Sequence, residues 1–173
     1  MSSRLKLQLG DITSMHVEAL VNSTDESLLE GGPVHAAIHR AAGPGLLEEC
    51  EAVGECPVGE VRITGAHELP ARYVIHTVAP TWVGGGEDET RALASCYRNA
   101  LRLAEAHCVK ELAFPSIGSG LQPQIPLEVA APIAIRTILD FLGEHAYPER
   151  VILVCYDPPT YLAHQKVLKE ALP

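Results

Sequence analysis

Two hydrophobic periods alternate along this chain. Apolar residues at every second position, or in short continuous runs, are typical of strands, whereas apolar residues three or four positions apart are typical of amphipathic helices. Strands that alternate with helices in this way predict an α/β fold with a mainly parallel interior sheet. We expect strands at about 4–10, 17–23, 59–66, 72–80, 111–114 and 150–156, and helices at about 33–43, 45–53, 88–107, 127–145 and 160–172.

The length and composition indicate one globular domain that spans residues 1–173. Apolar residues make up 47% of the chain and charged residues 20%, and we find no internal repeat, low-complexity tract or linker. No apolar run reaches the roughly 18 to 20 residues that a membrane helix needs, and the N-terminus lacks an apolar signal core. We therefore expect a cytoplasmic monomer without membrane contacts.

The net charge bears on possible partners, and the cysteine spacing bears on metal binding and on the redox compartment. The formal net charge of −9 argues against a nucleic-acid partner, because backbone binding depends on clustered Lys and Arg. The five cysteines form no CxxC pair, which favours free thiols in a reducing compartment over a zinc site. Three of them lie in apolar segments and are expected in the core, namely Cys96, Cys108 and Cys155.

Two glycine-rich turns follow predicted strands and lead toward predicted helices. They are Gly31–Gly32–Pro33–Val34 and Gly118–Ser119–Gly120–Leu121. Glycine lets the backbone approach a phosphate closely, and the start of a helix adds about half a positive charge. For either turn alone, an ordinary turn is the better interpretation, since neither fits GxGxxG or a phosphate loop. Two of them at strand ends in one small domain favour a diphosphate clamp.

Eight segments, in order and spacing, resemble the macro domain family. They are LGDIT, ALVNS, LLEGGPVHAAIHRAAGP, LLEEC, GEVRIT, LPARYVIHTVAP, AFPSIGSG and VILVCYD. The resemblance implies a three-layer α/β/α sandwich with a central mixed, mainly parallel sheet and a cleft that binds ADP-ribose without a cofactor. Some branches of the family remove ADP-ribose from proteins or deacetylate O-acetyl-ADP-ribose.

The resemblance also implies roles for individual residues. Asp11, with Ile12 beside it, corresponds to the carboxylate that accepts a hydrogen bond from the adenine amino group, and Tyr156 to the aromatic residue that packs against adenine. From the residues alone, Asp11 would be a turn aspartate and Tyr156 a core tyrosine. The full set of expected ligand-binding residues is Asp11, Ile12, Asn22, Asp25, Gly31, Gly32, Pro33, Val34, Ser116, Gly118, Ser119, Gly120, Leu121, Ile125 and Tyr156.

The first glycine loop departs from the family pattern. Where the family commonly reads NAAN, this chain reads Asn-Ser-Thr-Asp at 22–25, and His35 replaces the Asp that follows the family's glycines. In the MacroD-type branch both of these columns are tied to catalysis. An ionised Asp25 can only accept hydrogen bonds, and at about 7 Å and an effective dielectric near 20 it repels a phosphate charge by about 2 kcal/mol. Pro33 also lacks an N–H, so we expect a weaker clamp than is usual for the family.

The second loop is one residue longer than the family pattern and lacks its usual aromatic residue, so Ile125 is the expected substitute wall of the distal ribose pocket. The leading hypothesis is a module that binds ADP-ribose or an ADP-ribosylated protein. The alternative is an ADP-ribosyl hydrolase or O-acetyl-ADP-ribose deacetylase that uses Asp25 and His35 as catalytic residues. An RNA-binding module is disfavoured by the acidic charge.

Two further histidine features have simple interpretations. His35 and His39 have the i, i+4 spacing of metal ligands, but no Cys or third His lies nearby in sequence. Surface or capping roles are therefore expected for this pair, and no metal site is predicted. His76 lies inside an apolar strand and is expected to be a hydrogen-bonded core histidine.

Overall fold

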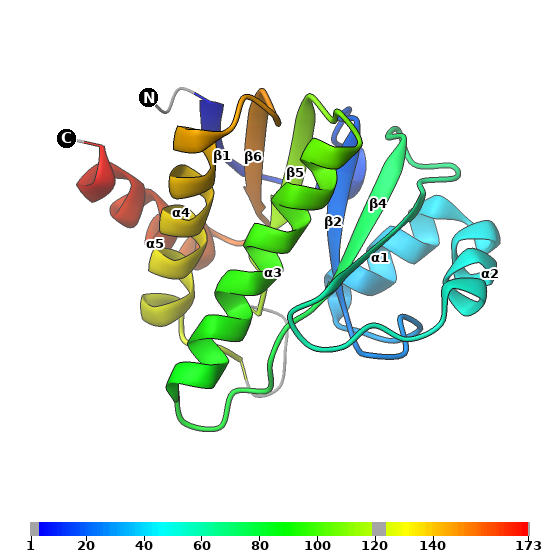
Figure 1. Ribbon diagram of the computed structural model, residues 1–173, viewed down its shortest axis with the longest axis horizontal. Coiled ribbons are helices and arrows are strands. Elements are labelled where there is room, and N and C mark those ends of the chain that lie inside the picture. The colour runs from blue at the N-terminus through cyan, green and yellow to red at the C-terminus, as the bar shows by residue number, and fades with distance from the viewer. Residues whose placement is uncertain (1–3, 119–123, 173) are drawn as a thin grey trace.

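The computed structural model describes residues 4–118 and 124–172 (Figure 1). Six strands form one sheet in the order β1-β6-β5-β2-β4-β3. Every neighbouring pair is parallel except β3 and β4, which confirms a mixed, mainly parallel sheet. The strands are β1 (Leu5–Leu9), β2 (Ala19–Thr24), β3 (Val61–Gly65), β4 (Tyr73–Val78), β5 (Glu111–Pro115) and β6 (Arg150–Cys155).

Helices cover both faces of the sheet and complete a three-layer sandwich, as expected. Side chains of α3 and α4 form one buried cluster with one face of the sheet, and side chains of α1 and α2 form a second cluster with the other face. In Figure 1, α3 and α4 lie in front of the sheet. The helices are η2 (Ile12–Ser14, a 3-10 turn), α1 (Pro33–Ala42), α2 (Pro44–Val53), α3 (Glu87–Ala106), α4 (Leu127–Glu144) and α5 (Pro158–Ala171).

The helix boundaries follow local chemistry. Pro33 and Pro44 stand at the first positions of α1 and α2, where a missing N–H costs no hydrogen bond. The last helix begins two residues earlier than predicted, because the side chain of Asp157 caps it by accepting from the Thr160 N–H at 2.9 Å. The sequence analysis missed η2, a single turn too short to show an apolar period.

The two faces of the sheet are covered unequally. On one face α3 packs on β3 and β4, and α5 packs on β1 and β6. On the other face the main strand contacts of α1 and α2 are to β2 and β3. Val154, near the end of β6, points to this second face and belongs to its buried cluster. The carboxyl ends of β5 and β6 therefore meet a smaller helical cover on this side.

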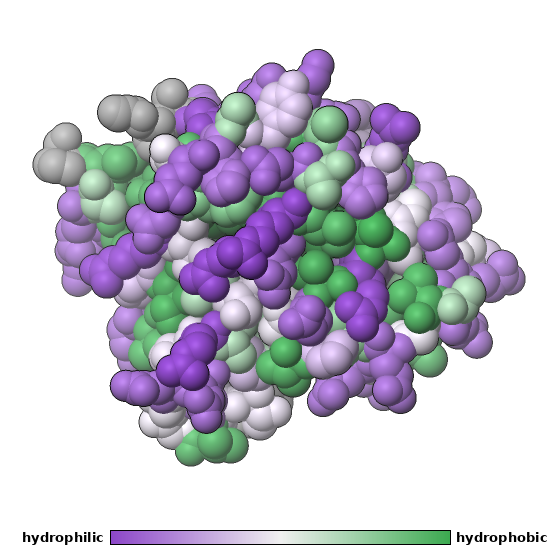
Figure 2. Space-filling model, in the orientation of Figure 1, coloured by the Kyte–Doolittle hydropathy of each residue, from purple (hydrophilic) through white to green (hydrophobic). Residues whose placement is uncertain are grey.

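The surface over α3 and α4 is mostly polar. Figure 2 shows the α3 and α4 face, where polar side chains cover the helices and smaller apolar patches lie between them. None of the helices in residues 4–118 and 124–172 is both long and apolar enough to cross a membrane.

All five thiols are free, and Cys108 is exposed rather than buried as expected, because it lies just after the end of α3 with a φ of 55°.

The buried hydroxyl of Tyr97 holds the chain that follows β5. Tyr97 is 1% exposed, its Oη accepts a hydrogen bond from the Ile117 N–H at 3.0 Å, and burial raises its pKa, which keeps the hydroxyl neutral. We expect Tyr97→Phe to lower the free energy of unfolding by about 1 to 3 kcal/mol, because the buried N–H loses its partner. Urea denaturation measures the change.

Tyr161→Phe is the matched control, since the half-buried Tyr161 forms no hydrogen bond through its hydroxyl within the described residues. We expect this control to change the free energy of unfolding by less than about 0.5 kcal/mol. Equal stability of Tyr97→Phe and the control would contradict the anchoring role of Tyr97.

Candidate functional site

A pocket of about 410 Å³ opens at the carboxyl ends of the parallel strands, on the side of α1. Its residues come from the ends of β1, β5 and β6, from η2, from one face of α1 and from the beginning of α5. Ligands of open α/β sheets bind at this edge, where loops turn into helices. The lining residues are Gly10, Asp11, Ile12, Pro33, Val34, Ala37, Arg40, Pro115, Ser116, Val154, Tyr156 and Thr160.

The pocket brings together part of the predicted ligand set. Six of its lining residues were predicted from the sequence, namely Asp11, Ile12, Pro33, Val34, Ser116 and Tyr156. The predicted residues that do not line it are Asn22, Asp25, Gly31, Gly32, Gly118 and Ile125. Three others, Ser119, Gly120 and Leu121, lie outside the described residues.

Sequence reasoning missed two residues of α1 that line the pocket. Ala37 and Arg40 share one helical face with Pro33 and Val34, at a spacing of three to four residues. This period was available in the sequence, because the helix was predicted with nearly the observed bounds. What the sequence lacked was a sign that this face of the helix borders a pocket.

Asp11 and Tyr156 have accessible side chains at one end of the pocket. The Asp11 carboxylate caps η2, with Oδ1 accepting from the N–H and the hydroxyl of Thr13 at 2.9 and 2.8 Å. These bonds fix the orientation of the carboxylate. Tyr156 is 58% exposed, so the alternative of a core tyrosine is wrong. Both side chains are positioned to contact a ligand.

The first glycine loop is tied back onto the end of β2. The Thr24 hydroxyl and the Asp25 N–H both donate to the Glu30 carbonyl at 2.9 Å. Asp25 Oδ1 accepts from the N–H and the hydroxyl of Ser27 at 3.1 and 2.6 Å. A Cβ on Gly31 would lie 2.7 Å from the Cβ of His35, so this position requires glycine because His35 packs beneath it.

Residues 21–134 match the family described as Macro domain. The chain belongs to the macro domain family. This macro domain is 47% identical over 174 residues to a protein of Citrobacter koseri named O-acetyl-ADP-ribose deacetylase, which covers 98% of each chain. It is also 47% identical to a Macro domain-containing protein of Methanosarcina mazei, over 98% of this chain and 90% of the relative.

Solved structures show the same fold with a nucleotide present. The Oceanobacillus iheyensis macrodomain with ADP superposes with a TM-score of 0.90 at 39% identity, over 97% of this chain and 91% of that chain. The Trypanosoma brucei macrodomain in complex with ADP superposes with a TM-score of 0.88 at 36% identity, over 95% of this chain and 69% of that chain. The fold predicted from the sequence is therefore that of the family.

Gly118, where the second loop of this macro domain begins, packs on a buried isoleucine. Gly118 has a φ of 93°, and its carbonyl accepts a hydrogen bond from the Ile125 N–H at 3.2 Å. A Cβ on Gly118 would lie 2.6 Å from Ile125 Cδ1, and the Ile125 side chain is 1% exposed. Ile125 therefore supports Gly118 from the core. It does not line the pocket as the expected wall, because packing against α3 and α4 buries its side chain.

A buried polar cluster, made of Asn22, His35, Thr64 and His76, lies between α1 and the sheet. Asn22 Nδ2 donates to Nδ1 of His35 and of His76 at 3.1 and 3.2 Å. Because Nδ1 of His76 is an acceptor, its proton lies on Nε2, which donates to the Thr64 hydroxyl at 2.9 Å. The expectation of a hydrogen-bonded core histidine at position 76 is confirmed, since His76 is fully buried.

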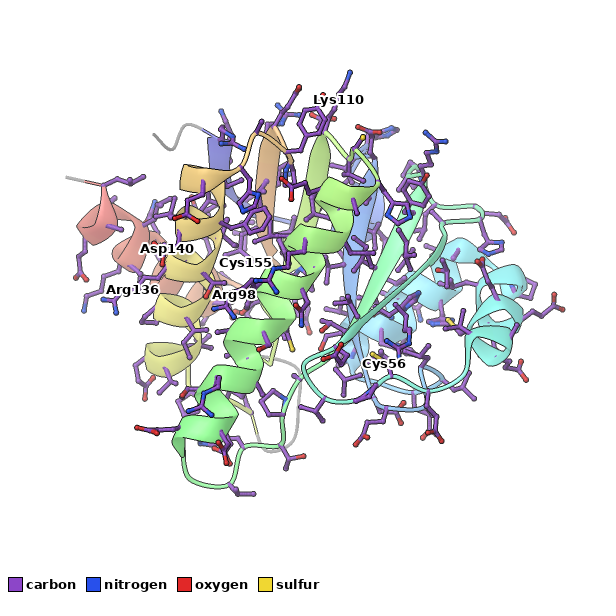
Figure 3. The ribbon with its side chains drawn as sticks, viewed as in Figure 1. Cys56, Arg98, Lys110, Arg136, Asp140 and Cys155 are labelled. Atoms are coloured by element: carbon purple, nitrogen blue, oxygen red, sulfur yellow. The ribbon has the colours of Figure 1, made fainter. Side chains whose placement is uncertain are left out.

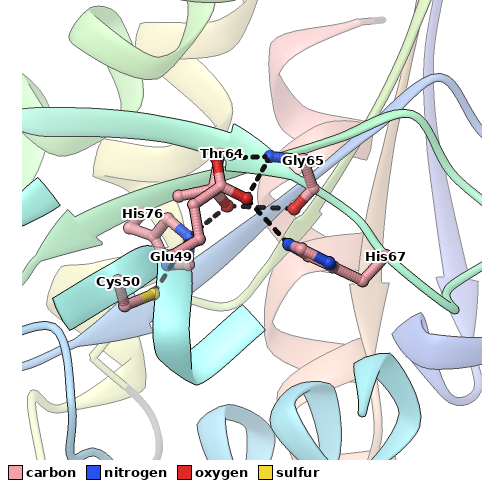
Figure 4. A network of polar contacts seen from close by, with 6 residues as sticks. All are labelled: Glu49, Cys50, Thr64, Gly65, His67 and His76. Carbon is pink, nitrogen blue, oxygen red and sulfur yellow. Dashed lines mark hydrogen bonds and ion pairs between the residues drawn. The ribbon is translucent and has the colours of Figure 1, made fainter. Parts of the chain in front are cut away.

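Figure 4 shows the outer part of this region, where the β3 strand meets α2. The Glu49 carboxylate accepts from the Gly65 N–H at 3.2 Å and pairs with His67 Nε2 at 2.7 Å. The Cys50 thiol lies 3.9 Å from Nε2 of His76. These contacts hold α2 against the end of β3 and cover the polar cluster from that side.

Burial favours the neutral form of the two histidines of α1 and of His76 beneath it. It lowers the pKa of His76 to about 3 and of His39 to about 4. Burial also lowers the pKa of His35, although a hydrogen bond with the Leu29 carbonyl and the nearby Asp25 partly oppose this shift. His35 is only 6% exposed, so the expected surface or capping role is wrong for this residue.

The contacts of Asp25 and His35 bear on the catalytic roles predicted for them. No hydrogen bond or ion pair joins Asp25 to His35 within residues 4–118 and 124–172. Nδ1 of His35 already accepts a hydrogen bond from Asn22, and its ring centroid lies 4.3 Å from that of His39, with the two ring planes tilted by 35°. The described residues contain no group of three or more side chains that could hold a metal ion. Catalytic roles for Asp25 and His35 remain predictions.

The lowered pKa of His76 predicts a pH-dependent stability. Between its unfolded value of 6.5 and its folded value of about 3, the unfolded chain binds the extra proton, so acidification favours unfolding. We expect the free energy of unfolding to fall below pH 6.5 with a slope of about 1.4 kcal/mol per pH unit for this histidine. Urea denaturation between about pH 7 and pH 5 measures the slope, above the range where most carboxylates titrate.

His76→Gln is expected to reduce this slope, whereas a substitution of the exposed His107 by Gln leaves it nearly unchanged. Wild-type and His76→Gln proteins with the same slope would show that His76 is not the group responsible.

Proposed function

We propose that this macro domain binds ADP-ribose, free or attached to a protein, in the pocket beside α1. The observation that carries the proposal is the joint presence of Asp11, Tyr156 and the start of α1 around one cavity at the carboxyl edge of the sheet. A volume of about 410 Å³ lies in the range of pockets that enclose small-molecule ligands. The solved relatives with ADP support the same use of the fold.

The two ends of the pocket suit the two halves of a nucleoside diphosphate. Asp11 offers an acceptor for an amino-purine and Tyr156 an exposed aromatic face for its ring, and stacking of a base on an aromatic side chain is worth about 1 to 3 kcal/mol. At the other end, the helix start at Pro33 and Val34 provides the positive end of a dipole for a diphosphate. A chain with a net charge of −9 needs such local dipoles to bind an anion.

Binding at the start of α1 can be tested by placing a charge there. Gly32 is the N-cap of α1 in an extended conformation that any residue adopts, with φ −80° and ψ −164°. We expect Gly32→Glu to weaken ADP-ribose binding by at least about tenfold, since the new carboxylate repels the diphosphate by about 2 kcal/mol. Isothermal titration calorimetry measures the affinity.

Gly86→Glu is the matched control. Gly86 is the N-cap of α3, also in an extended conformation with φ −67°, and a Cβ there meets no atom within 4 Å. We expect this variant to bind ADP-ribose as the wild type does. Unchanged affinity in Gly32→Glu would refute a diphosphate site at the start of α1.

A second candidate function is the deacetylation of O-acetyl-ADP-ribose. It is favoured by the name of the C. koseri relative, which matches at 47% identity over nearly the full length. If this macro domain carries that activity, the geometry favours Asp25 over His35 as the general base. Asp25 is half-buried in the first loop, whereas His35 is turned into the core and bonded to Asn22.

We expect Asp25→Asn to reduce acetate release from O-acetyl-ADP-ribose by about a hundredfold, the range of a lost general base. His35→Gln should change the rate by less than about threefold, provided that its unfolding transition shows a folded protein. Mass spectrometry of the ADP-ribose product follows the reaction. Release that neither substitution alters would refute a catalytic role for either residue.

A further inference from the structure

Arg40 is a cation on the wall of the pocket that the proposed function leaves without a role. It is the only Lys or Arg among the described residues that line the pocket, and its side chain is exposed. Within residues 4–118 and 124–172 it forms no hydrogen bond and no ion pair. The guanidinium group therefore has all of its donors available for a ligand.

Helix geometry places Arg40 well away from the start of α1. It lies seven residues after Pro33 on the same face of α1, which is two turns or about 10 Å along the helix axis. The helix also packs against η2, whose N-cap is Asp11. The distance of about 10 Å between Arg40 and the helix start is about one Debye length. The charge of Arg40 therefore acts only weakly on a diphosphate bound at the helix start.

The walls of the pocket come from different elements. Arg40 and Ala37 belong to α1, Tyr156 follows β6, and Val154 of β6 contributes an apolar side chain. Arg40 and Tyr156 thus line the pocket from different elements, and Asp11 lies near Tyr156, since the Gly10 N–H donates to the Cys155 carbonyl at 2.9 Å. A planar heterocycle fits a site with a guanidinium on one side and a phenol ring on the other.

We propose that Arg40 determines ligand specificity by covering the face of the purine opposite Tyr156, an inference that rests on the proposed function. A guanidinium is planar and weakly hydrated, so it stacks on aromatic rings better than an ammonium does. A phosphate on Arg40 is a poorer fit, because the Asp11 carboxylate in the same pocket repels a second anion. The ligand class is a neutral amino-purine whose edge donates to Asp11.

The test compares three ligands with the same base and different charge. Adenosine, AMP and ADP-ribose are titrated into the wild type and Arg40→Ala, by calorimetry for the tighter ligands and by NMR chemical shifts for adenosine. We expect Arg40→Ala to weaken all three by a similar factor of about fivefold to thirtyfold, because the lost contact is with the base. Arg40→Lys should recover only part of this loss.

Arg136→Ala is the matched control, since it removes the same charge from an exposed position on α4 (Figure 3), on the opposite face of the sheet. We expect it to bind all three ligands as the wild type does. Weaker binding of ADP-ribose with unchanged binding of adenosine would show that Arg40 acts through its charge alone, and would overturn the proposal. Full recovery in Arg40→Lys, or no loss in Arg40→Ala, would also overturn it.

The outcomes separate this inference from the function on which it rests. A wild-type protein that binds none of the three ligands refutes the proposed function and the role of Arg40 with it. A wild type that binds ADP-ribose with an affinity that Arg40→Ala leaves unchanged refutes only the role of Arg40.

Discussion

A mainly parallel sheet needs cover on both faces, and this constraint shapes the molecule. Among the described residues, one face is covered by α3, α4 and α5, whereas α1, α2 and the short η2 turn cover the other. Helices α1 and α2 pack mainly on β2 and β3. The ends of β5 and β6 are left to a loop and to the flank of α1, and the pocket forms there. The site thus results from the way the sheet is covered.

The buried polar cluster adds a second constraint beneath α1. Asn22 and His76 are neighbours in the register of β2 and β4, so their side chains share the face that α1 covers. One amide donates to both imidazoles, and the Nε2–H of His76 donates a hydrogen bond to the Thr64 hydroxyl. Buried polar groups need such partners, because each unpaired group carries a desolvation cost. His35 therefore fixes α1 against the sheet through the same contacts that keep its ring out of the pocket.

These constraints explain how an acidic protein can present an anion site. The first loop is held by backbone and side-chain bonds around Asp25, and Gly31 fits over His35 only because it has no Cβ. The helix that follows starts at a proline without loss of a hydrogen bond. The proposed anion site then relies on the positive end of α1 to supply locally what the net charge of −9 opposes.

The sequence by itself determined the order and type of the strands and long helices, because hydrophobic periods and proline or glycine at helix ends are local properties. It also indicated, through its resemblance to a family, the segments in which Asp11 and Tyr156 lie. Only the tertiary structure decided that Tyr156 is exposed while Ile125 and His35 are buried, and that Arg40 borders the pocket. A periodic pattern shows which residues share a face, but the neighbouring elements decide whether that face meets the core, solvent or a cavity.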